Sequence, residues 1–128
     1  MKNEPLRIHT AEGALRGAID EGIFVFKGIP YAAPPVGALR WRTPKPVTPW
    51  KEVRDATQWG NASWQHREQC VLAGGGDPGH LSEDCLYLNV WSPEIQPSRP
   101  LPVCRSHPSV LPASIETLST SVGNRSRR

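Results

Sequence analysis

Three short stretches near the start of the chain alternate apolar and polar residues. They are LRIHT (6–10), GALRGAI (13–19) and IFVFKGI (23–29), and turn residues at 12–13 and 20–22 separate them. β-Branched and aromatic side chains, which favour strands, recur in these runs. Short alternating runs joined by tight turns predict an antiparallel meander of three strands.

A proline-rich segment follows the third run. Six prolines lie between positions 30 and 49, and proline interrupts both helices and central strands. The segment is therefore either a long ordered loop wrapped over the rest of the chain or a disordered linker. Trp41 and Trp50 favour the ordered loop, because a solvated linker seldom carries large aromatic side chains.

The run LYLNVW (86–91) predicts one further strand. Its two faces both carry bulky side chains, with Leu86, Leu88 and Val90 alternating with Tyr87, Asn89 and Trp91. A strand that is bulky on both faces belongs inside a layered sheet. The residues between the proline-rich segment and this strand, 51–81, are mixed and polar, and predict no regular element.

The chain changes character after Val103. Residues 104–128 contain six serines and no aromatic residue, and only PASIETLSTSV (112–122) allows a weak helical turn or two. We expect residues 1–103 to form one structural unit, and residues 104–128 to be a disordered basic tail.

The net charge of +3 comes from this tail, because residues 1–103 carry eleven basic and eleven acidic side chains. A basic tail without interleaved aromatic residues is a weak signal for nucleic acid, so no nucleic-acid partner is expected. The first residues lack the apolar core of a secretory signal, and no run approaches the ~20 apolar residues of a membrane span. These features predict a cytoplasmic protein with no membrane partner.

No metal site or cofactor is expected. A zinc site built from Cys70, His80 and Cys85 would have irregular ligand spacing. The glycine-rich loop at 74–79 is followed by no helical period, and a glycine triplet cradles phosphate only when it leads into a helix N-terminus.

Two longer motifs resemble those of a known family. FKGIPYAAPPVGALRWRTPKP (26–46) and SEDCLYLNVWSP (82–93) are similar to the N-terminal part of the type-B carboxylesterases, the α/β-hydrolase group that includes cholinesterases and several lipases. The resemblance runs from about Gly13 to Val103. It implies an α/β fold, of which this chain supplies the N-terminal fragment: mostly antiparallel strands and long proline-rich loops.

The resemblance also implies roles for two charged residues and a cysteine. Glu83 would form a salt bridge with Arg40 and so fasten the proline-rich loop to the entry of the final strand. The alternative is that Glu83 and Asp84 only cap and solvate the strand end. Family members often bridge the cysteine at the position of Cys85 to an earlier one, but Ser63 stands where that partner would be. Cys70 is the candidate replacement, and two reduced thiols are the alternative.

The resemblance implies a serine nucleophile on G-x-S-x-G and an oxyanion hole on an H-G-G-G-type motif. Neither motif occurs in these 128 residues. Ser63, His66 and either Asp55 or Glu68 are close in sequence, but no oxyanion donors accompany them. No catalytic residue is therefore assigned, and His9, His80 and His107 are expected to be surface residues.

We thus expect a fragment of a serine carboxylesterase that is inactive alone, with a small-molecule carboxylic ester as the ligand only of a complete homologue. The switch after Val103 is what a shifted reading frame or a misassembled gene end would produce. The alternatives are a non-catalytic interaction module of the same fold, and a weak anion binder acting through the basic tail. Uncovered apolar faces and sheet edges make self-association a further expectation.

Overall fold

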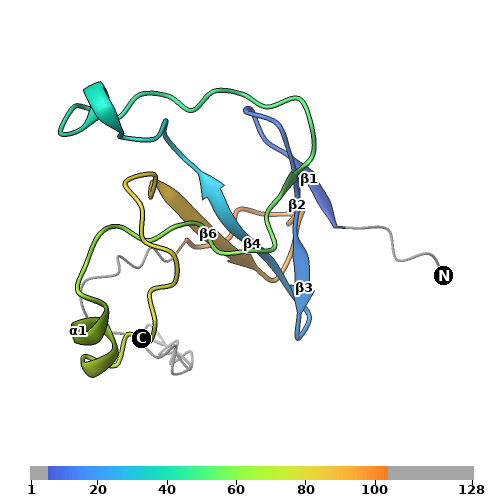
Figure 1. Cartoon of the computed structure of the whole chain (residues 1–128). Coiled ribbons are helices and arrows are strands. Elements are labelled where there is room, and N and C mark those ends of the chain that lie inside the picture. The colour runs from blue at the N-terminus through green and yellow to red at the C-terminus, as the bar shows by residue number, and fades with distance from the viewer. Residues whose placement is uncertain (1–5, 104–128) are drawn as a thin grey trace, which may run out of the picture.

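The computed structural model describes residues 6–103, which form mostly short strands joined by long irregular segments (Figure 1). The elements in chain order are β1 (Arg7–His9), β2 (Ala14–Arg16), β3 (Ala18–Asp20), β4 (Ile23–Pro30), the 3-10 helix η1 (Gly37–Leu39), β5 (Arg54–Asp55), α1 (Arg67–Leu72) and β6 (Tyr87–Ser92). The expectations for the tail at 104–128 and for His107 lie outside the described residues. No helix within residues 6–103 is long and apolar enough to cross a membrane.

The strands form two three-stranded sheets, ordered β1-β2-β5 and β3-β4-β6. β1 pairs antiparallel with β2, β5 pairs parallel with β2, and the second sheet is antiparallel throughout. The predicted three-stranded meander is therefore wrong, because the run at 13–19 divides at Gly17 between the two sheets. A Cβ atom at Gly17 would lie 2.5 Å from the ring of Phe26, so only a residue without a side chain can cross between the sheets here.

The tight turns fit the sequence pattern. Asp20 pairs with Ile23, and the two residues between them have positive φ, 47° for Glu21 and 83° for Gly22. This is the backbone of a two-residue type I′ hairpin, whose twist matches that of the flanking strands. In the turn between β1 and β2, the Thr10 hydroxyl donates to the carbonyl of Gly13 at 2.9 Å.

A small apolar core lies between the sheets. Leu15 of the first sheet and Ala56 beside β5 have no exposed surface, and Phe26 of the second sheet is 2% exposed. Partly buried side chains pack around these three: Leu6, Ile8, Phe24, Ile29, Trp50 and Ile95. The final strand is confirmed as β6, which pairs with β4. Its expected place inside a layered sheet is not met within residues 6–103, where β6 is an edge strand and Leu88, Val90 and Trp91 remain 38%, 40% and 48% exposed.

Residues 31–53 connect β4 to β5 as an irregular chain in which η1 is the only helical element (Figure 1). The amide of Ala33 donates to the carbonyl of Lys45 at 2.9 Å. The Trp50 indole donates to the carbonyl of Ala14 at 2.8 Å, which fastens the end of the loop to β2. Trp41, whose size favoured an ordered and packed loop, is 96% exposed and does not contribute to the packing.

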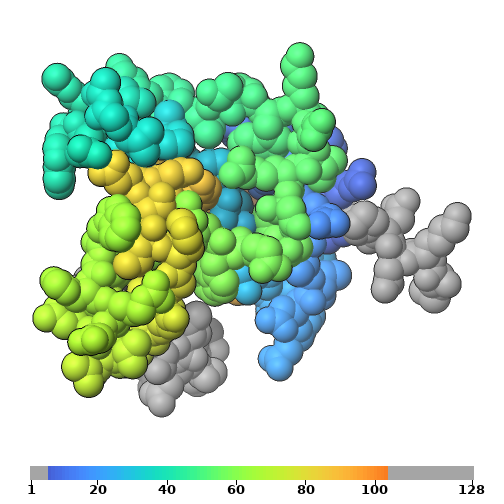
Figure 2. Space-filling view, viewed as in Figure 1, coloured from blue at the N-terminus to red at the C-terminus, as the bar shows by residue number. Residues whose placement is uncertain are grey.

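Two elements in residues 51–81 were not predicted from the sequence. β5 is a two-residue strand beside β2, and α1 has six residues. The helix ends where Gly74 adopts a φ of 81° and the amide of Gly75 donates to the carbonyl of Cys70 at 2.8 Å. Figure 2 shows this part of the chain, in yellow-green, as a lobe at one end of the molecule.

Candidate functional site

The structure brings Arg40 and Glu83 together. Arg40 directly follows η1, and its Nη2 lies 2.7 Å from Oε2 of Glu83 at the approach to β6. The side chains of Arg40 and Glu83 are 52% and 35% exposed, so solvent screens the attraction between their charges. The hydrogen bond that Arg40 donates to the Glu83 carboxylate, and then the negative charge of Glu83, raise the pKa of Arg40. The contact joins the proline-rich loop to the segment that leads into β6.

Asp84, the second acid of this segment, holds local structure together. Its Oδ2 accepts a hydrogen bond from the Tyr87 hydroxyl at 2.9 Å, and its carbonyl accepts one from Nδ2 of Asn61 at 3.0 Å. Burial, followed by the hydrogen bond to Asp84, raises the pKa of Tyr87. Asn61 also lies 3.1 Å from Nδ1 of His80. The carboxylate of Asp84 is thus occupied by a structural partner.

Cys70 and Cys85 are not bridged in this structure, and both are free thiols. The Cys70 thiol instead donates to Oε1 of Gln65 at 3.0 Å. Burial, with smaller contributions from the charges of Asp84 and Glu83, raises the pKa of the Cys85 thiol. A raised pKa leaves less thiolate at neutral pH, so Cys85 is a poor nucleophile.

The residues weighed as an improvised catalytic triad are not assembled. The Asp55 carboxylate accepts hydrogen bonds from Arg16 at 2.5 Å and from the Thr57 hydroxyl at 2.8 Å. Within residues 6–103, no hydrogen bond joins Ser63, His66 and an acid. A base must reach the nucleophile's proton to activate it, and this arrangement does not provide that contact.

The glycine-rich loop is closed by an arginine. Arg67, the first residue of α1, forms an ion pair with Asp77, and its Nη2 donates to the carbonyl of Gly79 at 2.8 Å. The side chain that would attract an anion is thus already paired within the loop. Among the described residues, no three His, Cys, Asp or Glu side chains converge as a metal site would require.

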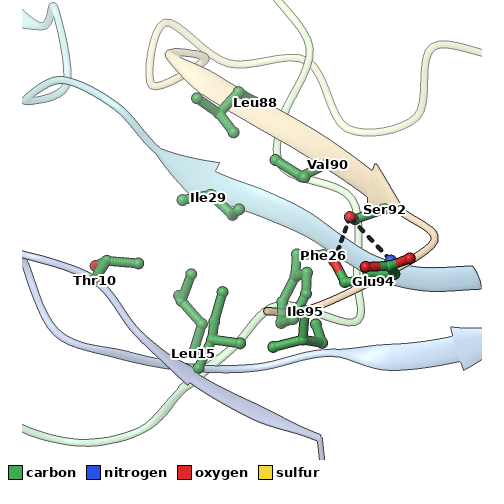
Figure 3. A pocket seen from close by; sticks show the side chains of 10 residues that line it. Thr10, Leu15, Phe26, Ile29, Leu88, Val90, Ser92, Glu94 and Ile95 are labelled. Carbon is green, nitrogen blue, oxygen red and sulfur yellow. Dashed lines mark hydrogen bonds between the residues drawn. The ribbon is translucent and has the colours of Figure 1, made fainter. Parts of the chain in front are cut away.

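An open cavity of about 390 Å³ lies between the two sheets (Figure 3). It is called the inter-sheet groove below. Its lining is mostly apolar and consists of Ile8, Thr10, Leu15, Phe26, Ile29, Leu88, Val90, Ser92, Glu94 and Ile95. The Ser92 hydroxyl donates to the Glu94 carbonyl at 2.6 Å, which turns the chain after β6 so that Ile95 reaches the groove. The hydroxyls of Ser92 and Thr10 in this lining bond to backbone atoms, and no hydrogen bond among the described residues joins either of them to the Glu94 carboxylate.

Sequence reasoning missed the side chains that join β4 to its neighbours. The amide of Gly28 donates to Oδ1 of Asn89 at 2.9 Å, and the Lys27 ammonium lies 4.8 Å from the ring centre of Trp59. Asn89 is the one polar position inside the apolar run 86–91, and that interruption was the available signal. The contact of Asn61 with the Asp84 carbonyl was also missed. Asn61 lies in a polar segment, where one more polar residue does not stand out from its neighbours.

The comparisons with known proteins agree on one family. A sequence model described as "Carboxylesterase family" matches residues 4–104. The phenmedipham hydrolase of Pseudarthrobacter oxydans is 46% identical over 97 residues, which are 73% of this chain and 20% of that protein. The cholinesterase of Mus musculus is 40% identical over 103 residues, 73% of this chain and 17% of that protein.

Solved structures extend the similarity to the backbone. A carboxylesterase of Geobacillus stearothermophilus matches with a TM-score of 0.55 and 45% identity, covering 68% of this chain and 16% of that structure. The chain therefore spans at most about a fifth of the length of the relatives it matches.

Proposed function

Because this chain belongs to the carboxylesterase family, we propose that it is the N-terminal part of a serine carboxylesterase and that it is catalytically inactive alone. The observation that carries this proposal is the extent of the match. The similarity occupies most of this chain, but only 20% of the phenmedipham hydrolase. The 128 residues contain neither a G-x-S-x-G nor an H-G-G-G motif, so the parts that perform acyl transfer are not among them.

The role that remains is architectural. β4 and β6 form adjacent strands of a sheet, and the contact between Arg40 and Glu83 joins the loop to the approach of β6. Neither feature touches a reacting atom. Both fix the framework on which a complete homologue would bind and hydrolyse a small carboxylic ester.

An ester hydrolysis assay tests this proposal. We expect no release of p-nitrophenol from p-nitrophenyl acetate above the buffer rate, and no labelling by a fluorophosphonate probe for activated serines. The para-nitrobenzyl esterase of Bacillus subtilis, 42% identical over 96 residues, provides the positive control. Hydrolysis that disappears in both Ser63→Ala and His66→Ala variants would show that the chain assembles its own nucleophile.

A non-catalytic interaction module is the second candidate, and the exposed tryptophans favour it. Trp41 projects from the loop with a φ of 59°, and Trp64 is also exposed. Large exposed aromatic side chains are enriched at binding surfaces. A Trp41→Ala variant that loses a partner retained by Trp64→Ala would support this candidate. Weak anion binding rests on residues 104–128, outside the described part of the chain.

A further inference from the structure

A second hollow, of about 220 Å³, lies where the segment at 54–61 meets β4 and the start of β6. It is called the polar hollow below. It shares no lining residue with the inter-sheet groove, and none of its side chains takes part in the contact between Arg40 and Glu83. The residues used in the argument below are Gly28, Arg54, Gln58, Trp59, Gly60 and Tyr87.

Two glycines shape the polar hollow. A Cβ atom at Gly28 would lie 2.7 Å from the carbonyl oxygen of Gln58, and one at Gly60 would lie 2.5 Å from the ring of Tyr87. The segment at 58–60 therefore rests directly on β4 and on Tyr87, and neither glycine has a side chain that would fill the space beside it. Gly28 also lies where the register of β4 against β6 shifts, and such bulges are frequent beside binding sites.

Arg54 of β5 supplies an unmatched positive charge to the polar hollow. Its side chain is half-buried, and its Cζ lies 5.6 Å from the ring centre of Trp50, a cation–π contact that orients the guanidinium. No ion pair within residues 6–103 includes Arg54, because the neighbouring carboxylate of Asp55 is paired with Arg16. A partly buried cation without an anionic partner is costly, so an anion bound beside Arg54 would be favoured.

The charges around the polar hollow also favour an anion. Asp55 contributes to the lining, but Arg16 lies 2.5 Å from its carboxylate. Asp84 accepts the Tyr87 hydroxyl hydrogen bond at 2.9 Å, and the Lys27 ammonium lies 4.8 Å from the ring centre of Trp59. Three basic side chains, Arg16, Lys27 and Arg54, thus stand against two acidic ones, Asp55 and Asp84.

The remaining side chains indicate the shape of the anion. Trp59 and Tyr87 contribute aromatic rings to the lining, and Trp59 is 63% exposed. Aromatic rings pack well against a flat, apolar group, whereas a guanidinium binds a carboxylate through two parallel hydrogen bonds. The amide of Gln58 adds a further donor at the rim. A ligand that combines a ring with a carboxylate matches both parts of the lining.

We propose that the polar hollow binds a small aromatic carboxylate, of which benzoate is the simplest, and that Arg54 binds the carboxylate group. This binding uses no catalytic group, so it does not depend on whether the chain hydrolyses esters. Tyr87 serves as a wall rather than as a donor, because its hydroxyl hydrogen is already given to Asp84.

An NMR titration of the full 128-residue chain tests the proposal. The indole N–H signal of Trp59, identified by its loss in Trp59→Phe, is followed as benzoate is added at low salt. We expect a saturable shift with a Kd of about 1 to 10 mM, the range for a small ligand held by one charged contact. Benzamide, which has the same shape without the charge, should bind at least about tenfold more weakly.

Variants locate the contact. Arg54→Gln should weaken benzoate binding at least about tenfold, and Arg54→Lys should weaken it less, because a lysine keeps the charge but not the two parallel hydrogen bonds. Arg42→Gln removes the same charge from an exposed loop position outside the polar hollow and should leave binding unchanged. Unshifted indole signals of the other tryptophans show that each variant keeps its fold.

Four results would contradict the proposal. The absence of a saturable shift with benzoate overturns it, as does equal binding of benzamide, and neither result depends on a variant. Unchanged binding in Arg54→Gln overturns the role of Arg54. Acetate bound as tightly as benzoate would show that the aromatic rings take no part, and would overturn the choice of an aromatic ligand.

Discussion

Leu15 and Leu88 line the same inter-sheet groove from strands of different sheets, yet their environments differ. Leu15 has no exposed surface, whereas Leu88 is 38% exposed. At the closed end of the groove, Phe26 and Ala56 complete the packing around Leu15. At the open end, β6 has a neighbour on one side only. The same residue type in the same kind of element is thus buried only where a second layer is present.

The largest expected effect is at the closed end. Leu15→Ala should lower the free energy of unfolding by about 2–5 kcal/mol, because it removes fully buried methyl groups and leaves a cavity. Leu88→Ala, the matched change at the open end, should cost about 1 kcal/mol or less, because much of that side chain is already in water. Urea denaturation followed by tryptophan fluorescence measures both. Equal losses would mean that the two ends are not packed differently.

The second prediction concerns Gly28, which lies between the two ends on β4. The register of β4 against β6 shifts between Phe26 and Ile29, and this bulge allows both side chains to face the groove. Gly28 has a φ of 64°, and a Cβ atom there would lie 2.7 Å from the carbonyl oxygen of Gln58. Gly28→Ala should therefore cost about 2–3 kcal/mol, from backbone strain together with the steric clash.

Gly22→Ala separates these two causes. Gly22 has a φ of 83°, but a Cβ atom there would meet nothing within 4 Å, so its substitution should cost only the strain, about 1 kcal/mol. Thermal unfolding monitored by circular dichroism gives both values. If the two variants are equally stable, the clash beside Gly28 is relieved at no cost and the bulge does not depend on glycine.

These features show what the sequence could and could not predict. Alternation and turn residues identified β1, β4, β6 and the hairpin at Asp20–Ile23, because these depend on local backbone preferences. The division at Gly17 was missed because it depends on the ring of Phe26, which contacts Gly17 only in the folded chain. β5 was missed because two residues are too few to show the alternation of apolar and polar side chains that marks a strand. Their pairing with β2 is set by tertiary contacts.

The contacts of the candidate site were likewise predicted only in part. Arg40 and Glu83 were paired through the motifs that contain them, and the structure places them in contact. The contacts of Asp84 with Asn61 and Tyr87 had no sequence signal, since they join an irregular segment to a strand. The contacts of side chains in loops are the hardest to predict from the sequence, because loops have no regular repeat that would tell which side chains lie on the same face.

A third prediction tests whether the loop at 31–53 depends on its ion pair. Glu83→Gln should increase the rate of proteolysis within this loop about twofold, with little change in melting temperature, because the pair is half-exposed and contributes little to global stability. Lys45→Gln, which removes a loop charge with no ion-pair partner among the described residues, is the control. The difference should shrink in high salt. An unchanged cleavage pattern in Glu83→Gln would mean that Trp50 alone holds the loop.

The smallest expected effect is a pH dependence at the closed end, where Asp55 precedes the buried Ala56. Hydrogen bonds from Thr57, and then from Arg16, lower the pKa of Asp55. The folded state thus binds the proton less readily than the unfolded state. The stabilisation by Asp55 is fully present above the unfolded value of about 3.9, and it is lost as the pH falls through the lower folded value.

Asp55→Asn should therefore reduce the fall in melting temperature between pH 7 and pH 3 and should have its main effect at neutral pH, where the wild-type carboxylate is charged. Asp20→Asn, in the exposed hairpin, provides the matched loss of one carboxylate. The effect is expected to be small because both Arg16 and Asp55 remain about half exposed, and water already solvates their charges. If Asp55→Asn and Asp20→Asn show the same acid sensitivity, the stability of the closed end comes from the packing of Leu15, Phe26 and Ala56 rather than from the polar contacts at its border.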